Sequence, residues 1–282
     1  MTTTTRPGRP AAVETRPSPG DPPRRDFKET PMTTTARFGR LAAVETRLFL
    51  REPATVFFSV LLPVALLLVL GTSIPAFRTP DPALGGLRVV DAHLPAMMVL
   101  LSVMTLALST LPITLAVYRE RGVLRRMSTT PVRPSMLLAV QLTLNTTVAV
   151  VATVLTLGLG HLVLRAPAPG APWWFAAVLT LGGLAMFALG LALAAVASGS
   201  RMVQGTGTIL LFPLLFFGGM WVPRPTMPDL LRRISDFTPS GAFGQGLLDA
   251  IGGHAPQALH LAVLAVWALA AGLVAARSFR WQ

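Results

Sequence analysis

The sequence of 282 residues contains no cysteine and only one lysine, Lys28, beside 23 arginines. Without cysteine, the chain can form no disulfide, no thiolate nucleophile and no cysteine-ligated metal site. The lysine of an ATP-binding P-loop follows a glycine-rich turn, whereas Lys28 stands in the sequence RRDFKET. The chain therefore cannot hydrolyse ATP through a P-loop. If ATP supplies energy, another polypeptide must bind it.

Charged residues are scarce as well. They make up 13% of the chain, and hydrophobic residues make up 52%, whereas soluble domains carry about 25% charged residues. Stretches without Asp, Glu, Lys or Arg that are long enough to cross a bilayer as helices recur six times. They lie at about 55–77, 94–117, 136–164, 173–197, 203–222 and 257–276. The sequence therefore predicts an all-α membrane protein with six transmembrane helices.

The charges that do occur are mostly basic and give a formal net charge of +12. Of the 24 basic residues, 18 fall on one side of the six spans and 6 on the other. Because Lys and Arg favour cytoplasmic loops, both termini and the loops 118–135 and 198–202 are predicted to be cytoplasmic. The preference for Arg over Lys indicates a GC-rich bacterial genome, and the expected location is a bacterial cytoplasmic membrane. The charge thus reports topology, and no nucleic-acid partner is expected.

The N-terminus contains a repeat, in which residues 1–17 and 32–48 match at 13 of 17 positions. Three prolines prevent a helix in the first copy, so residues 1–31 are predicted to be a disordered extension. An upstream start codon or a duplication without function is the alternative. The second copy predicts an interfacial elbow helix over 37–52, with Glu45 interrupting its apolar side. Its basic side carries Arg40, Arg47 and Arg51, and its apolar side carries Leu41, Val44 and Leu48.

Catalytic and metal-binding patterns are missing from the rest of the chain. No charged residue lies in the core of any predicted span, whereas ion-coupled carriers usually place one there. The four histidines have no metal-ligand spacing, and no nucleophile motif such as GxSxG occurs. We therefore expect no enzyme activity, no metal and no cofactor in this chain.

The loop between the second and third spans, 118–135, is the most informative segment. It begins YRERGVLRRMSTTP, and Arg121, Arg125 and Arg126 share one side of a short helix that Pro131 ends. A short basic helix suits docking onto a cytosolic partner. A solvated loop that only sets topology would show the same pattern.

This loop resembles the membrane subunits of ATP-binding-cassette exporters of the type-2 permease family. The resemblance is carried by Glu120, Arg121, Gly122, Leu124, Arg125, Arg126, Thr130 and Pro131. The block 212–250, with its aromatic span end, Pro-rich turn and short helix, is similar to the family's last extracellular region. The resemblance implies a six-span permease domain over 32–282. It also implies a second permease copy or paralogue and two ATPase subunits that bind ATP and Mg²⁺, with the loop as the coupling element of ATP-driven export.

The predicted extracellular region, 223–250, contains an amphipathic pattern. Met227, Leu230, Leu231 and Ile234 recur at helical spacing. A helix of this kind would lie at the outer interface and could gate release of a substrate. An ordinary connector before the last span is an equal alternative.

Two polar faces are candidates for a substrate path. They consist of Met98, Ser102, Thr105 and Ser109 in the second span and Gln204, Thr208, Phe212 and Phe216 in the fifth. The resemblance implies that the first, second and fifth spans line this path, although small and hydroxyl residues also serve helix packing. Because no fixed charge is available, we expect a hydrophobic or amphiphilic drug, antibiotic or lipid. A stand-alone channel or carrier for a neutral solute, or a non-transporting assembly or immunity factor, stays open as an alternative.

Overall fold

The computed structural model describes residues 34–82, 86–123 and 134–278. Within these ranges the chain folds into helices, and six segments are long and apolar enough to cross a membrane. They are Pro53–Ser73, His93–Glu120, Ser135–Leu164, Pro172–Val196, Ser200–Phe217 and Ala258–Ser278. This confirms the predicted all-α membrane protein with six spans. The first and fifth spans end earlier than predicted. The helix of the first span ends before Pro75, and the helix of the fifth span ends before Gly218 and Gly219.

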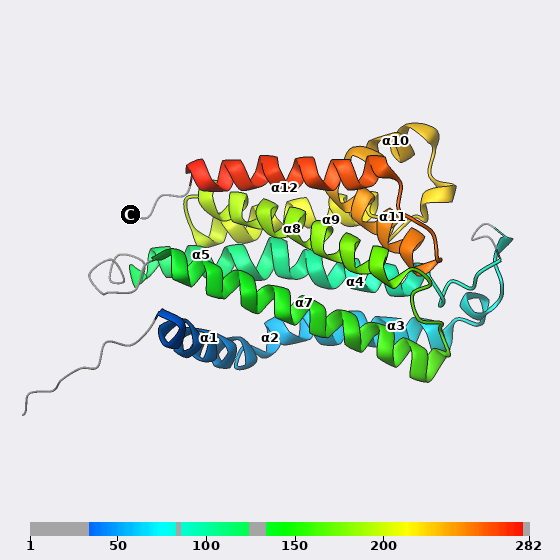
Figure 1. The fold of residues 1–282 in the computed structure, drawn as a ribbon, viewed down its shortest axis with the longest axis horizontal. Helices are drawn as coiled ribbons and strands as arrows, with labels where there is room; N and C mark the ends of the chain where they lie inside the picture. Colours follow the sequence, from blue (N-terminus) through cyan, green and yellow to red (C-terminus); the bar gives the residue numbers. More distant parts are fainter. Residues whose placement is uncertain (1–33, 83–85, 124–133, 279–282) are drawn as a thin grey trace, which may run out of the picture.

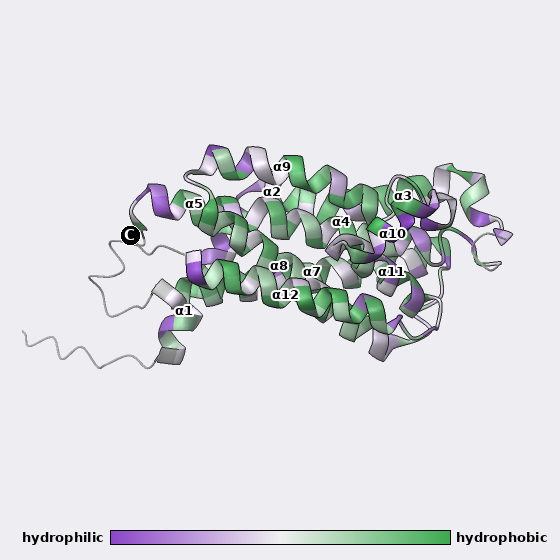
Figure 2. Cartoon of the chain, turned by 90° about the horizontal axis from the view of Figure 1, so that it is seen from above, coloured by the Kyte–Doolittle hydropathy of each residue, from purple (hydrophilic) through white to green (hydrophobic). Residues whose placement is uncertain are grey.

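The helices run side by side along one axis of the molecule (Figure 1). The first span consists of α2 (Pro53–Val56), η1 (Phe57–Leu61) and α3 (Leu62–Ser73), and the second of α4 (His93–Thr105), η4 (Leu106–Thr110) and α5 (Leu111–Glu120). The other spans are α7 (Pro134–Leu164), α8 (Pro172–Val196), α9 (Ser200–Phe217) and α12 (Ala258–Ser278). The helix α1 (Thr34–Leu50), the end of α5 and the end of α12 lie at the same end of the bundle, which we call the terminal end. Hydrophilic residues gather toward the two ends, with apolar residues between them (Figure 2).

The second span is the centre of the bundle. In its most apolar stretch 78% of the residues are buried, against 17% in the fifth span. The side chains of Leu100, Met104 and Leu108 are fully buried, and α4 packs against the first, third and fifth spans. The fourth span, α8, packs along the sixth span, α12. The fifth span is therefore a peripheral wall, and much of its surface is left uncovered.

The first and second spans each carry a π-helical turn just before an internal proline. Pro63 follows η1 and Pro112 follows η4, and neither proline can donate to the carbonyl four residues earlier. Ser102 Oγ on the neighbouring span donates to the carbonyl oxygen of Ser59, at 2.5 Å. The carbonyl left without a donor by Pro63 is thus satisfied by another helix, as membrane-spanning prolines require.

The π-helical turn η4 is packed against glycines of two other spans. A Cβ atom at Gly190 of α8 would overlap the carbonyl oxygen of Ala107, and one at Gly207 of α9 would overlap that of Leu108. These close approaches need residues without a side chain. The second, fourth and fifth spans therefore meet at η4.

Two helices cover the end opposite the termini. They are α10 (Asp229–Phe237) and α11 (Pro239–Ile251), joined by Thr238, whose Oγ1 accepts a hydrogen bond from the backbone N–H of Gly241 at 3.1 Å. The helix α11 is buried along most of its length and packs against α8, α12 and α4. Sequence analysis missed α11, because its glycine-rich sequence GAFGQG is typical of a loop. In the structure, these glycines permit close contact with Ser235, Gly218 and Val178.

Candidate functional site

A long groove runs along the flank of the bundle between the first, second and fifth spans. It consists of two cavities of about 650 Å³ and 640 Å³, which meet at Leu66, Met220 and Trp221. The first cavity reaches Glu52 and Thr114 toward the terminal end, and the second reaches the segment between α3 and α4. Pockets of this size bury most of a drug-sized molecule.

The two halves of the groove differ in chemistry. The half near the terminal end has a row of hydroxyl and amide side chains, and the rings of Phe58 and Phe212 line it as well. This row consists of Thr105, Ser109, Thr110, Thr114, Gln204 and Thr208. The other half is lined by sulfur-containing, aromatic and aliphatic side chains, together with the polar residues Asp81, His93 and Thr226. Its apolar lining includes Phe77, Met97, Met98, Met220 and Trp221. The groove is therefore amphiphilic along its length.

The structure places the predicted path residues as follows. Thr105, Ser109, Gln204, Thr208 and Phe212 line the cavity near the terminal end, and Met98 lines the other cavity. Ser102 is buried and bonded to the Ser59 carbonyl, so it has a packing role. Phe216 lines neither cavity, and its ring packs edge-on against that of Phe217 at 5.5 Å between centroids. The expectation that no fixed charge lines the path is wrong, because the carboxylate residue Glu52 lies in the lining.

Arg119 and Glu120, at the end of α5, bind the C-terminal end of α8 and the start of α9. The guanidinium of Arg119 donates to the carbonyl oxygens of Ala194, at 3.1 Å, and of Ala197. The carboxylate of Glu120 accepts from the backbone N–H of Ser200 at 2.7 Å and from its hydroxyl at 2.8 Å. A cation thus sits at the C-terminus of α8 and an anion at the N-terminus of α9, the arrangement that each helix dipole favours. We call these contacts the Arg119–Glu120 clasp.

The clasp changes the interpretation of the predicted coupling residues. Glu120 binds the start of the fifth span, whereas the loop to which the sequence assigns it joins the second and third spans. Arg121 is exposed, and Gly122 ends the helix with φ of 63°, a left-handed backbone that favours glycine. Leu124, Arg125, Arg126, Thr130 and Pro131 lie outside the described residues. Arg119 was not identified from the sequence.

The predicted elbow helix is α1, although it begins and ends earlier than predicted. Arg40, Arg47, Val44 and Leu48 are exposed, Leu41 is partly buried, and Arg51 follows the helix. Glu45, which interrupts the apolar pattern, is buried instead of facing solvent. Its Oε2 accepts hydrogen bonds of 2.7 Å from Tyr118 Oη and from Gln141 Nε2. Burial raises the pKa of the Glu45 carboxyl above its ordinary value, while these two hydrogen bonds oppose the shift.

Glu45 therefore links α1 to the end of the second span and to the start of the third. These are the two spans that flank the loop 118–135. A sequence cannot show this contact, because Tyr118 and Gln141 lie 73 and 96 residues away from Glu45. The available signal was the acidic residue itself, on an otherwise apolar helix side.

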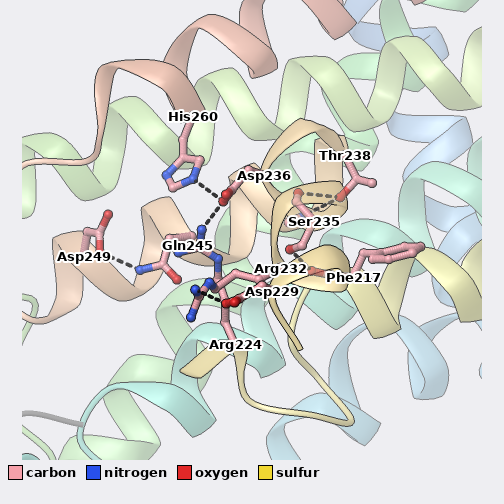
Figure 3. A network of polar contacts seen from close by, with 11 residues as sticks. Phe217, Arg224, Asp229, Arg232, Ser235, Asp236, Thr238, Gln245, Asp249 and His260 are labelled. Atoms are coloured by element: carbon pink, nitrogen blue, oxygen red, sulfur yellow. Dashed lines mark hydrogen bonds and ion pairs between the residues drawn. The ribbon is translucent and has the colours of Figure 1, made fainter. Parts of the chain in front are cut away.

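The helix α10 is held by polar contacts on its inner side (Figure 3). Asp236 pairs with Arg224 and with Nε2 of the buried His260, at 3.1 Å from the histidine. Ser235 Oγ donates to the carbonyl oxygen of Phe217 at 2.7 Å, which ties α10 to the fifth span. The helix thus connects the fifth span to α12 through side chains that the sequence pattern did not single out.

The predicted gate residues occupy a different arrangement from the expected one. Met227 is buried but precedes α10, Leu231 is partly buried, and Leu230 and Ile234 are exposed. Leu230 and Ile234 therefore point away from the bundle, whereas Ser235 and Asp236 pack inward. This arrangement suits a helix lying against the membrane interface.

Comparison with known proteins agrees with this architecture. Residues 37–251 match the family described as ABC-2 type transporter. This range includes both walls of the groove, the Arg119–Glu120 clasp and α11. Over 218 residues the chain is 26% identical to a protein of Bacillus subtilis (strain 168) named as a transport permease, YvfS, with 76% of this chain and 85% of that protein covered. Because the family match spans more than half of the sequence, the protein belongs to the ABC-2 type transporter family and is a transport permease of an ABC transporter.

Proposed function

We propose that the protein is the membrane-spanning subunit of an ATP-driven exporter that moves a hydrophobic or amphiphilic molecule out of a bacterial cell. The observation that carries the proposal is the groove between the first, second and fifth spans. Its volume suits a drug-sized ligand, and its lining combines apolar and aromatic side chains with a short row of hydroxyls. A drug, an antibiotic or a lipid has both kinds of surface.

Family membership implies an ABC ATPase as the partner. In the proposed complex, two ATPase subunits bind ATP and Mg²⁺ at the terminal end, which faces the cytoplasm because basic residues concentrate there. The loop 118–135 docks on the ATPase, and a second permease, either a copy or a paralogue, completes the pathway. This chain contributes the pathway and no catalytic residue of ATP hydrolysis.

The Arg119–Glu120 clasp supports a route for the coupling. The ATPase would move the loop 118–135, to which Glu120 belongs, and the clasp would carry that motion to Ser200, the first residue of α9. Since α9 is the least buried span and forms one wall of the groove, its rigid-body motion would open or close the path.

The test is transport into inside-out proteoliposomes that hold the chain with its ATPase. We expect a hydrophobic fluorescent dye to accumulate only when both subunits and ATP are present. Replacement of the P-loop lysine of the ATPase should abolish accumulation. Equal transport by the chain alone would contradict the proposal and favour a stand-alone carrier. Dye movement in the opposite direction would overturn the assignment as an exporter.

A further inference from the structure

We infer that the groove takes an organic cation: a molecule with an apolar body and a protonated amine that sits near the terminal end. The inference rests on the proposed function and specifies its substrate class. It is carried by three properties of the lining, namely its fixed charge, the hydrogen-bonding state of its hydroxyls and its aromatic and sulfur-containing walls.

Glu52 supplies the fixed charge. It lies at the mouth of the groove near the terminal end, between α1 and α2, and it is exposed. Thr55 Oγ1 donates to one of its carboxylate oxygens at 3.1 Å. A carboxylate has about four acceptor positions, so this single bond leaves capacity for a charged donor. An ammonium group, which has three donors and no acceptor, is the matching chemistry.

Three threonine hydroxyls of the groove present acceptors. Thr105, Thr114 and Thr208 each donate to a carbonyl four residues earlier in their own helix, over 2.8–2.9 Å. A hydroxyl has one hydrogen and two lone pairs. The hydroxyl hydrogens of these three threonines are already used, and their oxygens can still accept hydrogen bonds from a ligand in the groove that they line. These three oxygens favour a ligand head group that has N–H donors.

The carboxylates are the charged side chains that distinguish this lining from one suited to an anion. Among the described residues that line the two cavities, the carboxylates of Glu52 and Asp81 are present and no arginine is. Arg78 donates to the carbonyl oxygens of Gly71 and Thr72 at the end of α3, at 2.8 Å each. Arg88 is paired with Asp91. A carboxylate or phosphate head group near Glu52 would meet a like charge and no arginine in the described lining of that cavity.

The walls suit the rest of such a molecule. The rings of Phe58, Phe212 and Trp221 line the groove, and aromatic faces attract cations. In the half away from the terminal end, Met97, Met98 and Met220 offer flexible and polarizable contacts, which accommodate apolar bodies of varied shape. The head group would thus lie among acceptors and the body among thioethers and rings.

The experiment measures equilibrium binding of three probes to the full chain in phosphatidylcholine nanodiscs, with empty nanodiscs subtracted. The probes are a dansyl-labelled long-chain amine, its N-acetyl amide and the matching carboxylic acid. We expect the amine to bind about tenfold more tightly than the acid. Glu52→Gln should remove most of the preference of the amine over the amide. Asp229→Asn, which removes a carboxylate that is 80% exposed on α10, is the matched control and should keep it.

Equal binding of the three probes, or an unchanged preference in Glu52→Gln, would overturn the inference. The inference would also be overturned if no probe bound and Thr208→Cys formed a disulfide between two copies of the chain, because a second copy would then fill the groove. Such a cross-link is unambiguous, since the chain has no cysteine of its own. If the chain preferred the amine but showed no ATP-driven transport, the inference would be supported and the proposed function would be contradicted. Failure of the inference can therefore be distinguished from failure of the proposed function.

Discussion

Glu120→Ala is expected to lower ATP-driven transport about tenfold, the size of a typical coupling between two sites, while the protein still folds and binds its ATPase. The carboxylate of Glu120 accepts both the backbone N–H and the hydroxyl of Ser200. Alanine removes both contacts and leaves the loop 118–135 without its connection to the groove wall. Glu120→Gln keeps an acceptor oxygen, so its transport should lie between those of alanine and wild type.

Arg121→Glu is the matched comparison for this prediction. Arg121 belongs to the predicted docking surface and is exposed beside the clasp, so its reversal should weaken co-purification of the ATPase. Glu120→Ala should leave co-purification and basal ATP hydrolysis near wild type and reduce transport per ATP hydrolysed. Wild-type transport by Glu120→Ala, or loss of ATPase binding in that variant, would refute the role assigned to the clasp.

Gly190→Ala is expected to destabilise the protein by about 3 kcal/mol or more, the upper range for overpacking. A Cβ atom at this position would overlap the carbonyl oxygen of Ala107, which belongs to the backbone of η4 and cannot rotate away as a side chain can. An alanine inside a helix is otherwise favoured over glycine by about 1 kcal/mol. The expected sign is therefore opposite to that of helix propensity.

Gly183→Ala provides the control on the same helix. A Cβ atom at Gly183 would have no neighbouring atom within 4 Å, so propensity should dominate, and stability should be equal or higher. Thermal midpoints from fluorescence-detected size-exclusion chromatography measure both variants. A fall of about 6 °C or more is expected for Gly190→Ala and none for Gly183→Ala. Equal midpoints would show that η4 moves to accommodate the added atom.

Hydropathy was sufficient to predict the spans, because a helix that crosses a bilayer needs about 20 apolar residues and few other elements do. The segment 239–251 was missed for the same reason. Its buried helix α11 has 13 residues, too few to span, and its glycines are typical of loops until the close packing against Val178 and Gly218 is visible. Local sequence patterns therefore predict the long elements of this fold and overlook the short buried one.

The polar contacts were less predictable than the helices. Glu120 was identified as a functional residue, but its partner Ser200 lies 80 residues away, and the sequence gives no sign of the pairing. Glu45 was considered a flaw in an apolar face, whereas the fold gives it two hydrogen-bond donors from two spans. In both cases a charged residue beside a span marked the position, and only the tertiary structure supplied its role.

The groove was predicted in part. Helical spacing brought Thr105 and Ser109 onto one face of the second span and Gln204, Thr208 and Phe212 onto one face of the fifth, and the structure assembles these residues around one cavity. Ser102 fell on the same face by spacing but serves the Ser59 carbonyl. Glu52 was not considered, because it precedes the first span and reaches the groove only through the turn after α1.

The most direct measurement is ATP-driven transport by Thr208→Cys before and after reaction with a bulky thiol reagent, with complete labelling verified by intact mass. Thr208 lines the groove. Its neighbour Ile209 is 73% exposed and lies outside the groove lining, so Ile209→Cys is the control. The account predicts that labelling stops transport in Thr208→Cys and leaves Ile209→Cys active. An unchanged transport rate in fully labelled Thr208→Cys would contradict it.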